Sequence, residues 1–316
     1  MKNTKPKFYM TVGLPGSSKS TWAETHKDEL NVVIHSSDSI REELFGNAND
    51  QSKNTEVFEI LHKRIKDDLR AGKNVVYDAT NLNRKRRIHM LQNELRDIPC
   101  EKVCVLFATP YEMCLARNFA RDRQVPDGVM ARMYKSFETP CLQEGFDDIQ
   151  IVWADYKDMQ GFEYDIYTDL KKWRKINHNN PHHASTIGYH MIKAYNHYIC
   201  NYGEIEDHLR WAVLMHDCAK DVCKSYYNSK GEYDPNIAHY YSHENCGAML
   251  SLFYLRELCP NWTDKDILYT SLLINLHMRP YVWVQSEKAR QNDLKLFGAD
   301  IVNDVYILNK CDRFAH

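Results

Sequence analysis

A run of small residues follows the first apolar segment of this chain and ends in Lys-Ser-Thr. The run is Gly13–Thr21, it comes directly after Phe8–Val12, and it precedes a segment suited to the start of a helix. A strand, a glycine-bearing loop, a lysine and a helix start are typical, in this order, of a phosphate-binding loop. Glycines let the backbone approach phosphates, and the loop amides and helix start favour negative charge. The first half is therefore expected to be an α/β domain with a parallel sheet flanked by helices.

The residues of this loop have separate expected roles. Lys19 reaches the β- and γ-phosphates, and the Ser20 hydroxyl binds Mg²⁺. Ser18 stands where the pattern G-x-x-x-x-G-K-[ST] has its second glycine, and serine tolerates fewer backbone conformations than glycine. The alternative is a Gly-Pro-Gly-Ser turn with an exposed lysine. We expect ATP and Mg²⁺ to contact Gly13, Gly16, Ser17, Ser18, Lys19, Ser20 and Thr21.

Length and composition narrow the class of protein. The 316 residues suggest two domains. A net charge of -2 argues against a strongly basic nucleic-acid binder, although a local basic groove remains compatible with it. No stretch is apolar enough to span a membrane, and the N-terminus lacks the apolar core of a signal peptide. Ten cysteines without a C-x-x-C pair indicate reduced thiols. These features predict a cytoplasmic protein with no membrane partner.

Acidic residues follow two predicted strands of the first half. Asp38 comes after the strand Asn31–His35, and Asp78 lies in the strand segment Asn74–Asn81. Asp78 is expected to assist Mg²⁺. Asp38 has two interpretations: it caps the next helix, or it accepts a proton from an attacking hydroxyl while Arg41, on the same helical face, holds an acceptor phosphate. Spacing alone leaves both open.

Basic residues cluster in two further places. The run Arg84–Arg87 is either a solvated helix face or a source of one or two phosphate contacts. Arg117 and Arg121 are four residues apart within a segment, about 111–146, whose pattern suits a helical lid. Arginines on such a lid would neutralise charge on a transferring phosphoryl group and exclude water, whereas the alternative is that they lie on a helix surface.

Residues 7–155 resemble the 5′-hydroxyl polynucleotide kinases. The resemblance implies that Asp38 is the general base, that Arg41 binds the acceptor phosphate, and that lid arginines bind ATP. Related P-loop kinases phosphorylate small hydroxyl compounds or nucleotide-sugar acceptors, so the acceptor stays open. The motifs that carry the resemblance are Gly13–Thr21, Ser37–Arg41, Tyr77–Arg84, Arg117–Pro126 and Glu144–Phe146. On this basis we predict Lys19, Asp38 and Arg121 as catalytic, Asp78, Arg117, Arg121 and Arg123 at the nucleotide, and Asp38, Arg41, Thr80, Asn81, Arg84 and Arg87 at the acceptor.

The second half has a helical pattern and holds most of the histidines. Of the 15 histidines, only His26, His35, His62 and His89 precede residue 150. A single histidine on a helix is usually a hydrogen-bonded core or surface residue. The pair His216-Asp217, however, follows an apolar helical segment, and a buried pair of this kind needs partners for both polar groups. A metal ion would supply them.

Residues 180–316 resemble an HD-superfamily phosphohydrolase domain. The motif H…HD…D is carried by His190, His216-Asp217 and Asp312, and His216–Lys220 matches H-D-x-G-K except at Ala219. The resemblance implies a catalytic Asp217, a substrate phosphate on Lys220, and one or two divalent metals among Mn²⁺, Fe, Co²⁺, Ni²⁺ or Zn²⁺. The predicted ligands are His190, His216, Asp217, His243, His277 and Asp312. Residues 180–183 resemble the opening of such domains.

Together these predictions describe a kinase domain at 1–158, a connector at 159–179 and an all-α HD-type domain at 180–316. A 5′-kinase joined to a phosphohydrolase suits nucleic-acid end healing, in which a 5′-hydroxyl is phosphorylated and a 3′-phosphate or 2′,3′-cyclic phosphate is removed. RNA ends are favoured over DNA ends, with an RNA ligase as a possible pathway partner. One alternative is a small-molecule or nucleotide kinase fused to a nucleotide or dinucleoside-polyphosphate phosphohydrolase. Another is a regulatory ATP-binding module with a degenerate HD domain.

Overall fold

The computed structural model describes residues 5–48, 50, 52–155, 157–181, 185–203 and 208–316. The chain packs as two compact units. The first comprises Met1–Met130 and Pro140–Met159, and the second comprises Ala131–Thr139 and Gln160–His316. Each unit is described by itself below.

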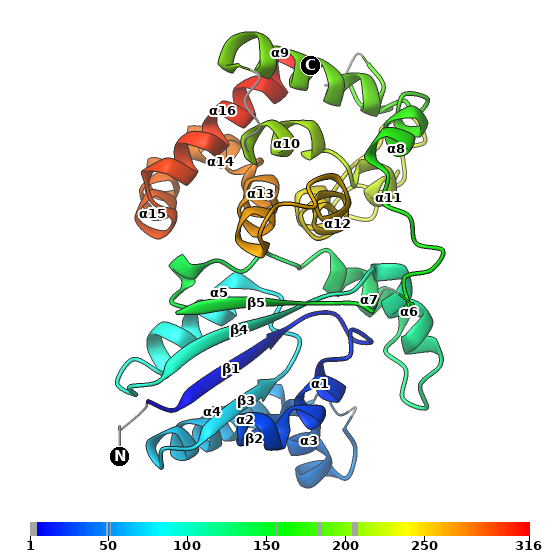
Figure 1. The fold of residues 1–316 in the computed structure, drawn as a ribbon. Helices are drawn as coiled ribbons and strands as arrows, with labels where there is room; N and C mark the ends of the chain where they lie inside the picture. Colours follow the sequence, from blue (N-terminus) through cyan, green and yellow to red (C-terminus); the bar gives the residue numbers. More distant parts are fainter. Residues whose placement is uncertain (1–4, 49, 51, 156, 182–184, 204–207) are drawn as a thin grey trace. The chain divides into compact units, whose positions relative to one another are not determined.

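A five-stranded parallel sheet forms the centre of the first unit (Figure 1). Its strand order is β2-β3-β1-β4-β5, so β1 lies between β3 and β4 and leads directly into the glycine-bearing loop. The expected parallel α/β sheet is thus confirmed. The strands are β1 (Lys7–Val12), β2 (Val32–Ser36), β3 (Asn74–Asp78), β4 (Glu101–Ala108) and β5 (Asp148–Trp153).

Helices cover both faces of this sheet. Side chains alternate along a strand, so adjacent residues of β1 face opposite ways. Tyr9 packs against Trp22 on one face. Phe8 lies on the other face beside Tyr77, whose ring contacts His62. The helical elements of this unit are α1 (Lys19–Thr25), α2 (Lys27–Leu30), α3 (Ser37–Phe45), α4 (Asn54–Arg70), α5 (Arg84–Ile88), the π-helical η1 (His89–Glu94), α6 (Tyr111–Phe119), the start of α7 (Asp127–Tyr134) and the 3-10 turn η2 (Leu142–Glu144).

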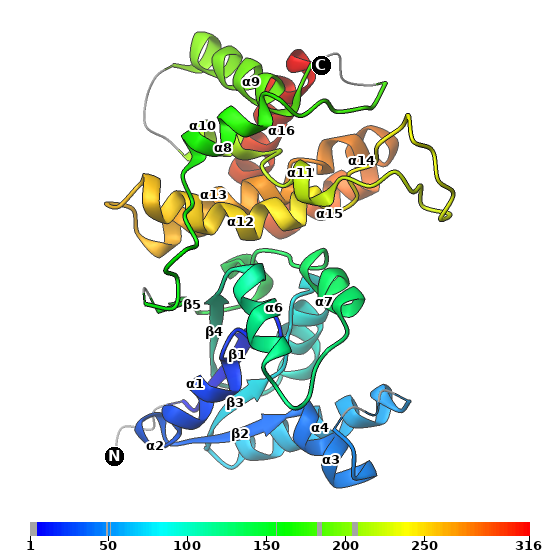
Figure 2. The same cartoon turned by 90° about the vertical axis from the view of Figure 1, so that its right-hand side faces the viewer.

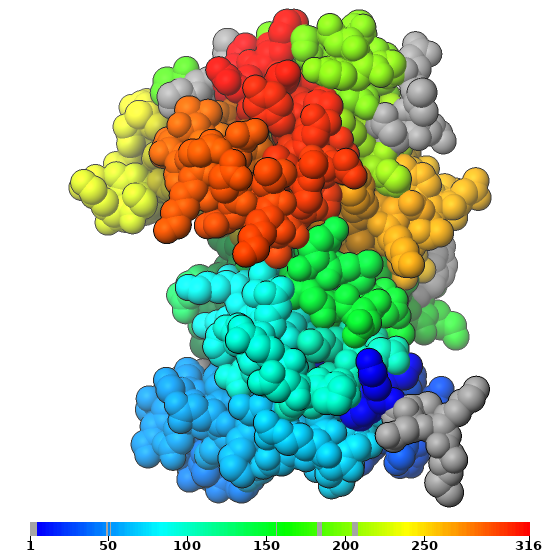
Figure 3. Space-filling model, turned by 90° about the vertical axis from the view of Figure 1, so that its left-hand side faces the viewer, coloured from blue at the N-terminus to red at the C-terminus, as the bar shows by residue number. Residues whose placement is uncertain are grey.

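The second unit is built from helices, as the sequence pattern predicts. Helices α12 and α13 pack together, α9 packs against both α10 and α16, and α14, α15 and α16 pack on one another. Figure 2 shows the helices of this unit from a second direction, and in Figure 3 the orange and red residues of α14–α16 form one continuous surface. The helices are α8 (Ile166–Trp173), α9 (Ile187–Tyr202), α10 (His208–Met215), α11 (Lys220–Cys223), α12 (His243–Leu258), α13 (Asp264–Leu276), α14 (Arg279–Gln285), α15 (Glu287–Phe297) and α16 (Ala299–Ala315).

The boundary of the helical unit differs from the predicted one in two places. Residues Ala131–Thr139, which we predicted within the lid, belong to the helical unit because the Tyr134 hydroxyl donates to the Cys246 carbonyl and Thr139 bonds Ser271. The predicted connector also belongs to this unit, since α8 buries Trp173 there. Because this segment is rich in polar residues, its composition did not indicate that one face of α8 is buried.

Among the described residues, no helix is both long enough and apolar enough to cross a membrane. The ten cysteines are free thiols, and most of them are buried.

Candidate functional site

The phosphate loop joins β1 to α1 and is held by the neighbouring strand. The Gly13 amide donates to the Thr80 carbonyl at 3.0 Å, and the Asn81 side chain donates to the Thr11 carbonyl at 2.9 Å. Gly16 has a φ of 82°, and a Cβ there would lie 2.6 Å from the Cys114 carbonyl oxygen. The contacts of Thr80 and Asn81, which we predicted at the acceptor, therefore fix the loop.

Ser18 adopts the backbone conformation that glycine usually supplies at this place. Its φ is 71° and its ψ is 19°, in the left-handed region. A residue with a Cβ is strained there by about 1–2 kcal/mol relative to glycine. The Ser18 hydroxyl also accepts a hydrogen bond from Arg117 at 3.1 Å. The departure at Ser18 thus preserves the loop shape at some cost in stability.

Lys19 and Ser20 lie where a phosphate and its metal ion would be bound. The Lys19 side chain is buried and donates to the Leu14 carbonyl at 2.7 Å. Burial lowers the pKa of Lys19 to about 8, against the opposing effect of Asp78. The Ser20 hydroxyl donates to Asp78 at 2.6 Å. This hydroxyl–carboxylate pair, at the carboxyl end of β3, suits a Mg²⁺ ion with its waters.

Asp38 is free of the capping role that was one interpretation of its place in the sequence. Ser36 caps α3 instead, with its side chain accepting from the Asp38 amide. The Asp38 carboxylate is half exposed, and it accepts from Arg41 at 2.9 Å and from Arg123 at 2.9 Å. Asp38 and Asp78 both line a hollow of about 430 Å³, together with Ser20. The carboxylate therefore lines the same hollow as the Ser20 hydroxyl at the start of α1.

The three predicted lid arginines have different surroundings. Arg117 donates to Ser18 of the loop and pairs with Asp158. Arg121 is exposed, and its charge is close enough to contribute to the lowered pKa of Lys19. Arg123 contacts Asp38 and the Ala48 carbonyl rather than the loop. Arg123, which we predicted at the nucleotide, thus contacts Asp38, and no local spacing in the sequence indicated this pairing.

Arg87 is a structural residue rather than an acceptor ligand. Its guanidinium is fully buried and forms two hydrogen bonds, of 2.6 and 2.7 Å, with the buried carboxylate of Glu144. Arg84 is also buried and lies 3.3 Å from the same carboxylate. The predicted phosphate contacts of both residues are replaced by this ion pair. Arg84 and Arg87 are three residues apart and so lie on the same face of the helix. This spacing could have indicated that both side chains point into the protein.

In the second unit, the six predicted ligands come together in two groups. The first group has the Nε2 atoms of His190 and His216 3.1 Å apart, with an Asp312 oxygen 3.0 and 3.4 Å from them. The second group has the Nε2 atoms of His243 and His277 3.1 Å apart. Their elements are α9, the end of α10, α12, the end of α13 and α16.

Asp217 connects the two groups through its two oxygens. Oδ2 lies 3.3 Å from both His190 and His216, whereas Oδ1 lies 3.2 Å from His243 and 4.0 Å from His277. The Lys220 ammonium forms an ion pair with Oδ2, at 2.7 Å. All six ligand residues are buried. One carboxylate between two histidine pairs is an arrangement that can bridge two cations.

The hydrogen bonds of three histidines orient their ligand atoms. The Nδ1 atoms of His216, His243 and His277 lie 2.7–2.8 Å from backbone carbonyls of Val213, Tyr240 and Ile274, respectively. A carbonyl only accepts, so each Nδ1 donates and each neutral ring presents a lone pair on Nε2. The lone pairs of His243 and His277 then face each other at 3.1 Å. Such a contact is repulsive unless a cation lies between the two atoms, so the donor set fits a metal ion.

The charges of the cluster also favour bound cations. Burial disfavours protonated His216, but Asp217 and Asp312 outweigh it and raise its pKa to about 10. Burial and the neighbouring His243 instead lower the pKa of His277 to about 3. The cluster thus attracts positive charge but cannot protonate all of its rings, and imidazole and carboxylate ligands suit divalent transition metals.

Two contacts of this cluster were not predicted, and part of the segment 180–183, which resembles the opening of HD-type domains, lies outside the described residues. The Tyr281 hydroxyl donates to the second oxygen of Asp312 at 3.1 Å, which orients that carboxylate. The His178 ring lies edge-to-face with the His190 ring, with centroids 5.6 Å apart. His182 and His183 are not among the described residues.

The chain was compared with known proteins. Residues 8–140 match the family profile described as an AAA domain. The chain is also 28% identical over 141 residues to an L-seryl-tRNA(Sec) kinase of Methanococcus maripaludis. The aligned region covers 43% of this chain and 54% of that protein. The chain therefore spans about half the length of the curated relative that it matches.

Solved structures with partial likeness to the chain include a putative kinase and a chain of an RNA repair complex. A putative kinase from Chloroflexus aurantiacus is 15% identical with a TM-score of 0.40, over 49% of this chain and 88% of that one. A chain of the Pnkp1/Rnl/Hen1 RNA repair complex is 23% identical with a TM-score of 0.37, over 42% of this chain and 44% of that one. The profile match and the sheet together show a P-loop, kinase-like domain in the first unit.

Proposed function

We propose that this chain is a cytoplasmic nucleic-acid end-healing enzyme with two active sites. Its first unit transfers the γ-phosphate of ATP to a 5′-hydroxyl, and its second unit, an HD-type domain, hydrolyses a 3′-phosphate or 2′,3′-cyclic phosphate. RNA ends are the preferred substrates, and an RNA ligase would use the healed ends.

In the kinase site, each residue has a role that its surroundings support. Asp38 accepts the proton of the attacking hydroxyl, and Arg41 binds the acceptor phosphate. Lys19 and the loop amides hold the β- and γ-phosphates, with Mg²⁺ at Ser20 and Asp78. Arg117 and Arg121 neutralise charge on the transferring phosphoryl group.

The observation that carries the kinase proposal is the placement of the Asp38 carboxylate. It lines the same hollow as Ser20 and Asp78, and two guanidiniums hold it. The two guanidiniums fix the direction in which the carboxylate points, as a base that must meet an acceptor hydroxyl requires. Neither a structural cap nor a solvated surface residue requires this environment.

In the hydrolase site, His190, His216 and Asp312 would hold one metal, and His243 and His277 would hold a second, with Asp217 shared. Bound divalent metals lower the pKa of a coordinated water and polarise a phosphorus–oxygen bond. Lys220, 2.7 Å from Asp217, adds a positive charge for the substrate phosphate. The facing lone pairs of His243 and His277 are the observation that carries this part of the proposal.

One observation favours a second candidate for the kinase acceptor. The curated relative at 28% identity is named a seryl-tRNA kinase, so its acceptor is a serine hydroxyl carried by a tRNA. The same base and phosphate loop would serve either a 5′-hydroxyl or such a side-chain hydroxyl. The acceptor is therefore the property to test first.

An acceptor assay with γ-labelled ATP and Mg²⁺ tests the kinase proposal. The acceptors are a 5′-hydroxyl RNA, the matching DNA, seryl-tRNA and a set of small hydroxyl compounds, each with wild type and Lys19→Ala. We expect label on the RNA that the variant fails to transfer. Label on seryl-tRNA or a small compound alone would overturn the end-healing proposal while keeping a kinase.

A further inference from the structure

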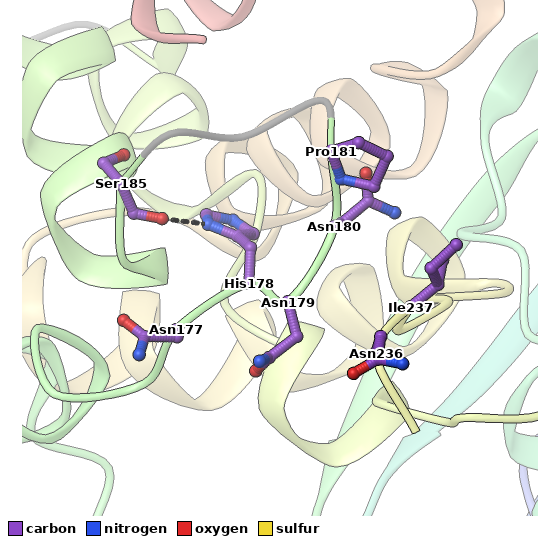
Figure 4. Close-up of a pocket in the computed structure, with 8 residues that line it drawn as sticks. All are labelled: Asn177, His178, Asn179, Asn180, Pro181, Ser185, Asn236 and Ile237. Atoms are coloured by element: carbon purple, nitrogen blue, oxygen red, sulfur yellow. Dashed lines mark hydrogen bonds between the residues drawn. The ribbon is translucent and has the colours of Figure 1, made fainter. Parts of the chain in front are cut away.

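A pocket of about 490 Å³ in the second unit is lined mainly by polar residues (Figure 4). Its volume falls within the range of about 300–1,000 Å³ that is typical of small-molecule sites. Four asparagines line it, Asn177, Asn179, Asn180 and Asn236, together with His178 and Ile237. The contributing residues come from two parts of the chain, 177–181 with Ser185 and 236–237, that are far apart in the sequence.

Hydrogen bonds hold these two segments in a fixed relation. The Ala238 amide donates to the Asn179 carbonyl at 2.6 Å, and the Asn180 side chain donates back to the Ala238 carbonyl at 2.9 Å. Lys224 donates to the Asn177 carbonyl and the Asn179 side chain, both at 2.7 Å. The pocket is therefore formed before any ligand binds, which lowers the entropy cost of binding.

One wall of the pocket is shared with the metal-ligand cluster. The buried His178 lines the pocket, and its ring packs edge-to-face against that of His190, with centroids 5.6 Å apart. The Tyr240 hydroxyl donates to the His178 carbonyl. The Lys220 ammonium lies 5.5 Å from the centre of the Tyr240 ring and pairs with Asp217. A ligand in the pocket thus lies one side chain away from the groups that would bind a phosphate.

The chemistry of the lining selects an uncharged, hydrogen-bonding group. The described residues that line the pocket include no Lys, Arg, Asp or Glu. Asn177 and Asn236 are exposed. Each amide offers a donor and an acceptor, the combination that pairs with a nucleobase edge. Ile237 provides apolar surface for the face of a base.

We propose that this pocket binds the nucleoside part of a nucleotide whose phosphate reaches the metal-ligand cluster. The proposal rests on the phosphohydrolase function proposed above and narrows its substrates to nucleotides, free or at the end of a chain. The phosphate would be directed to the cluster, because positive charge lies at Lys220, and would lie at any metals bound there, rather than on the described residues of the pocket.

Direct binding tests the pocket independently of hydrolysis. Calorimetry and saturation-transfer NMR with adenosine, guanosine, cytidine and uridine would be compared for wild type and the double variant Asn177→Ala/Asn236→Ala. We expect binding that the double variant weakens about tenfold. The control Asn201→Ala, an exposed asparagine on α9 that does not line the pocket, should bind as wild type. Equal binding by all three proteins, or none by wild type, would overturn the proposal.

Hydrolysis kinetics distinguish a wrong assignment of the pocket from a wrong assignment of the phosphohydrolase activity. Metal-loaded protein is given p-nitrophenyl esters, which lack a base, and 3′- or 2′,3′-cyclic nucleotides, either free or terminating an oligonucleotide. We expect the double variant to raise the KM of the nucleotides about tenfold, with kcat and p-nitrophenyl ester turnover unchanged. Equal losses on both substrate types would overturn the pocket alone, and no wild-type hydrolysis of either would overturn the phosphohydrolase.

The same kinetics identify the source of the nucleoside. A pocket that serves chain ends predicts a lower KM for the oligonucleotide than for the free nucleotide, and the opposite order indicates a free nucleotide. Ile237→Trp, which fills the pocket from an exposed position, should act like the double variant on both.

Discussion

The phosphate loop and the metal-ligand cluster differ in how their residues are spread along the chain. The loop is one continuous segment, Gly13–Thr21, whose shape follows from a strand, a turn and a helix start. The cluster draws on five helical elements between His190 and Asp312. A local site can thus be recognised from spacing. A dispersed site needs the whole helical unit, which here brings the three ligand atoms of each group within 4.8 Å of one another.

Asp217 is the one residue shared by both ligand groups, so its substitution should have the largest effect. Asp217→Asn keeps the size of the side chain but removes the negative charge between the histidine pairs. We expect both metals to be lost and hydrolysis to fall by about 1,000-fold or more. Elemental analysis of the purified protein and ester hydrolysis measure the two effects.

ATP binding at the phosphate loop serves as the control measurement for this variant. ATP binding to Asp217→Asn should equal that of wild type, since the loop draws nothing from the cluster. A variant that retains its full metal content would contradict the bridging role of Asp217.

The basic run in the first unit tests whether neighbouring arginines differ as the structure indicates. Arg87→Met leaves the buried Glu144 without its main partner, so we expect the free energy of unfolding to fall by about 3–5 kcal/mol. Arg86→Met changes an exposed arginine of the same run and should stay within about 0.5 kcal/mol of wild type. Urea denaturation measures both, and similar values for the two variants would argue against the buried ion pair.

Arg117 and Arg123 have different contacts, so their substitution should affect different substrates of the kinase reaction. Arg123 contacts Asp38, the proposed base, so Arg123→Ala should lower kcat/KM for the acceptor about tenfold and leave the KM for ATP unchanged. Arg117→Ala should instead raise the KM for ATP, because Arg117 donates to the loop residue Ser18. Steady-state kinetics in both substrates separate the two, and a rise in the ATP KM of Arg123→Ala would return Arg123 to the nucleotide side.

The smallest expected effect concerns the loop itself. Ser18→Gly relieves a left-handed residue and should raise the free energy of unfolding by about 1 kcal/mol while ATP binding is retained. Ser18→Val, which adds a β-branch at the same φ, is the contrasting variant and should lower both stability and binding. A destabilised Ser18→Gly would mean that the hydrogen bond from Arg117 outweighs the strain.

These cases show what the sequence could and could not predict. The parallel sheet, the loop and the strand-end residues Asp38 and Asp78 follow from periodicity and order along the chain, because local propensity and sheet geometry determine them. The pair Arg123–Asp38 joins residues 85 apart, and Arg87–Glu144 joins residues 57 apart. Such partners depend on packing that no spacing encodes. The six ligands were grouped by resemblance to a family rather than by spacing, for the same reason.

One experiment tests whether this chain catalyses two separate reactions, phosphate transfer in its first unit and phosphate hydrolysis in its second. An RNA with a 5′-hydroxyl and a 2′,3′-cyclic phosphate is incubated with ATP, Mg²⁺ and a transition metal, and both ends are followed by mass spectrometry. We predict that wild type converts both ends, that Lys19→Ala loses only 5′ phosphorylation, and that Asp217→Asn loses only the change at the 3′ end. Wild-type protein that binds ATP and metal but alters neither end would contradict the account.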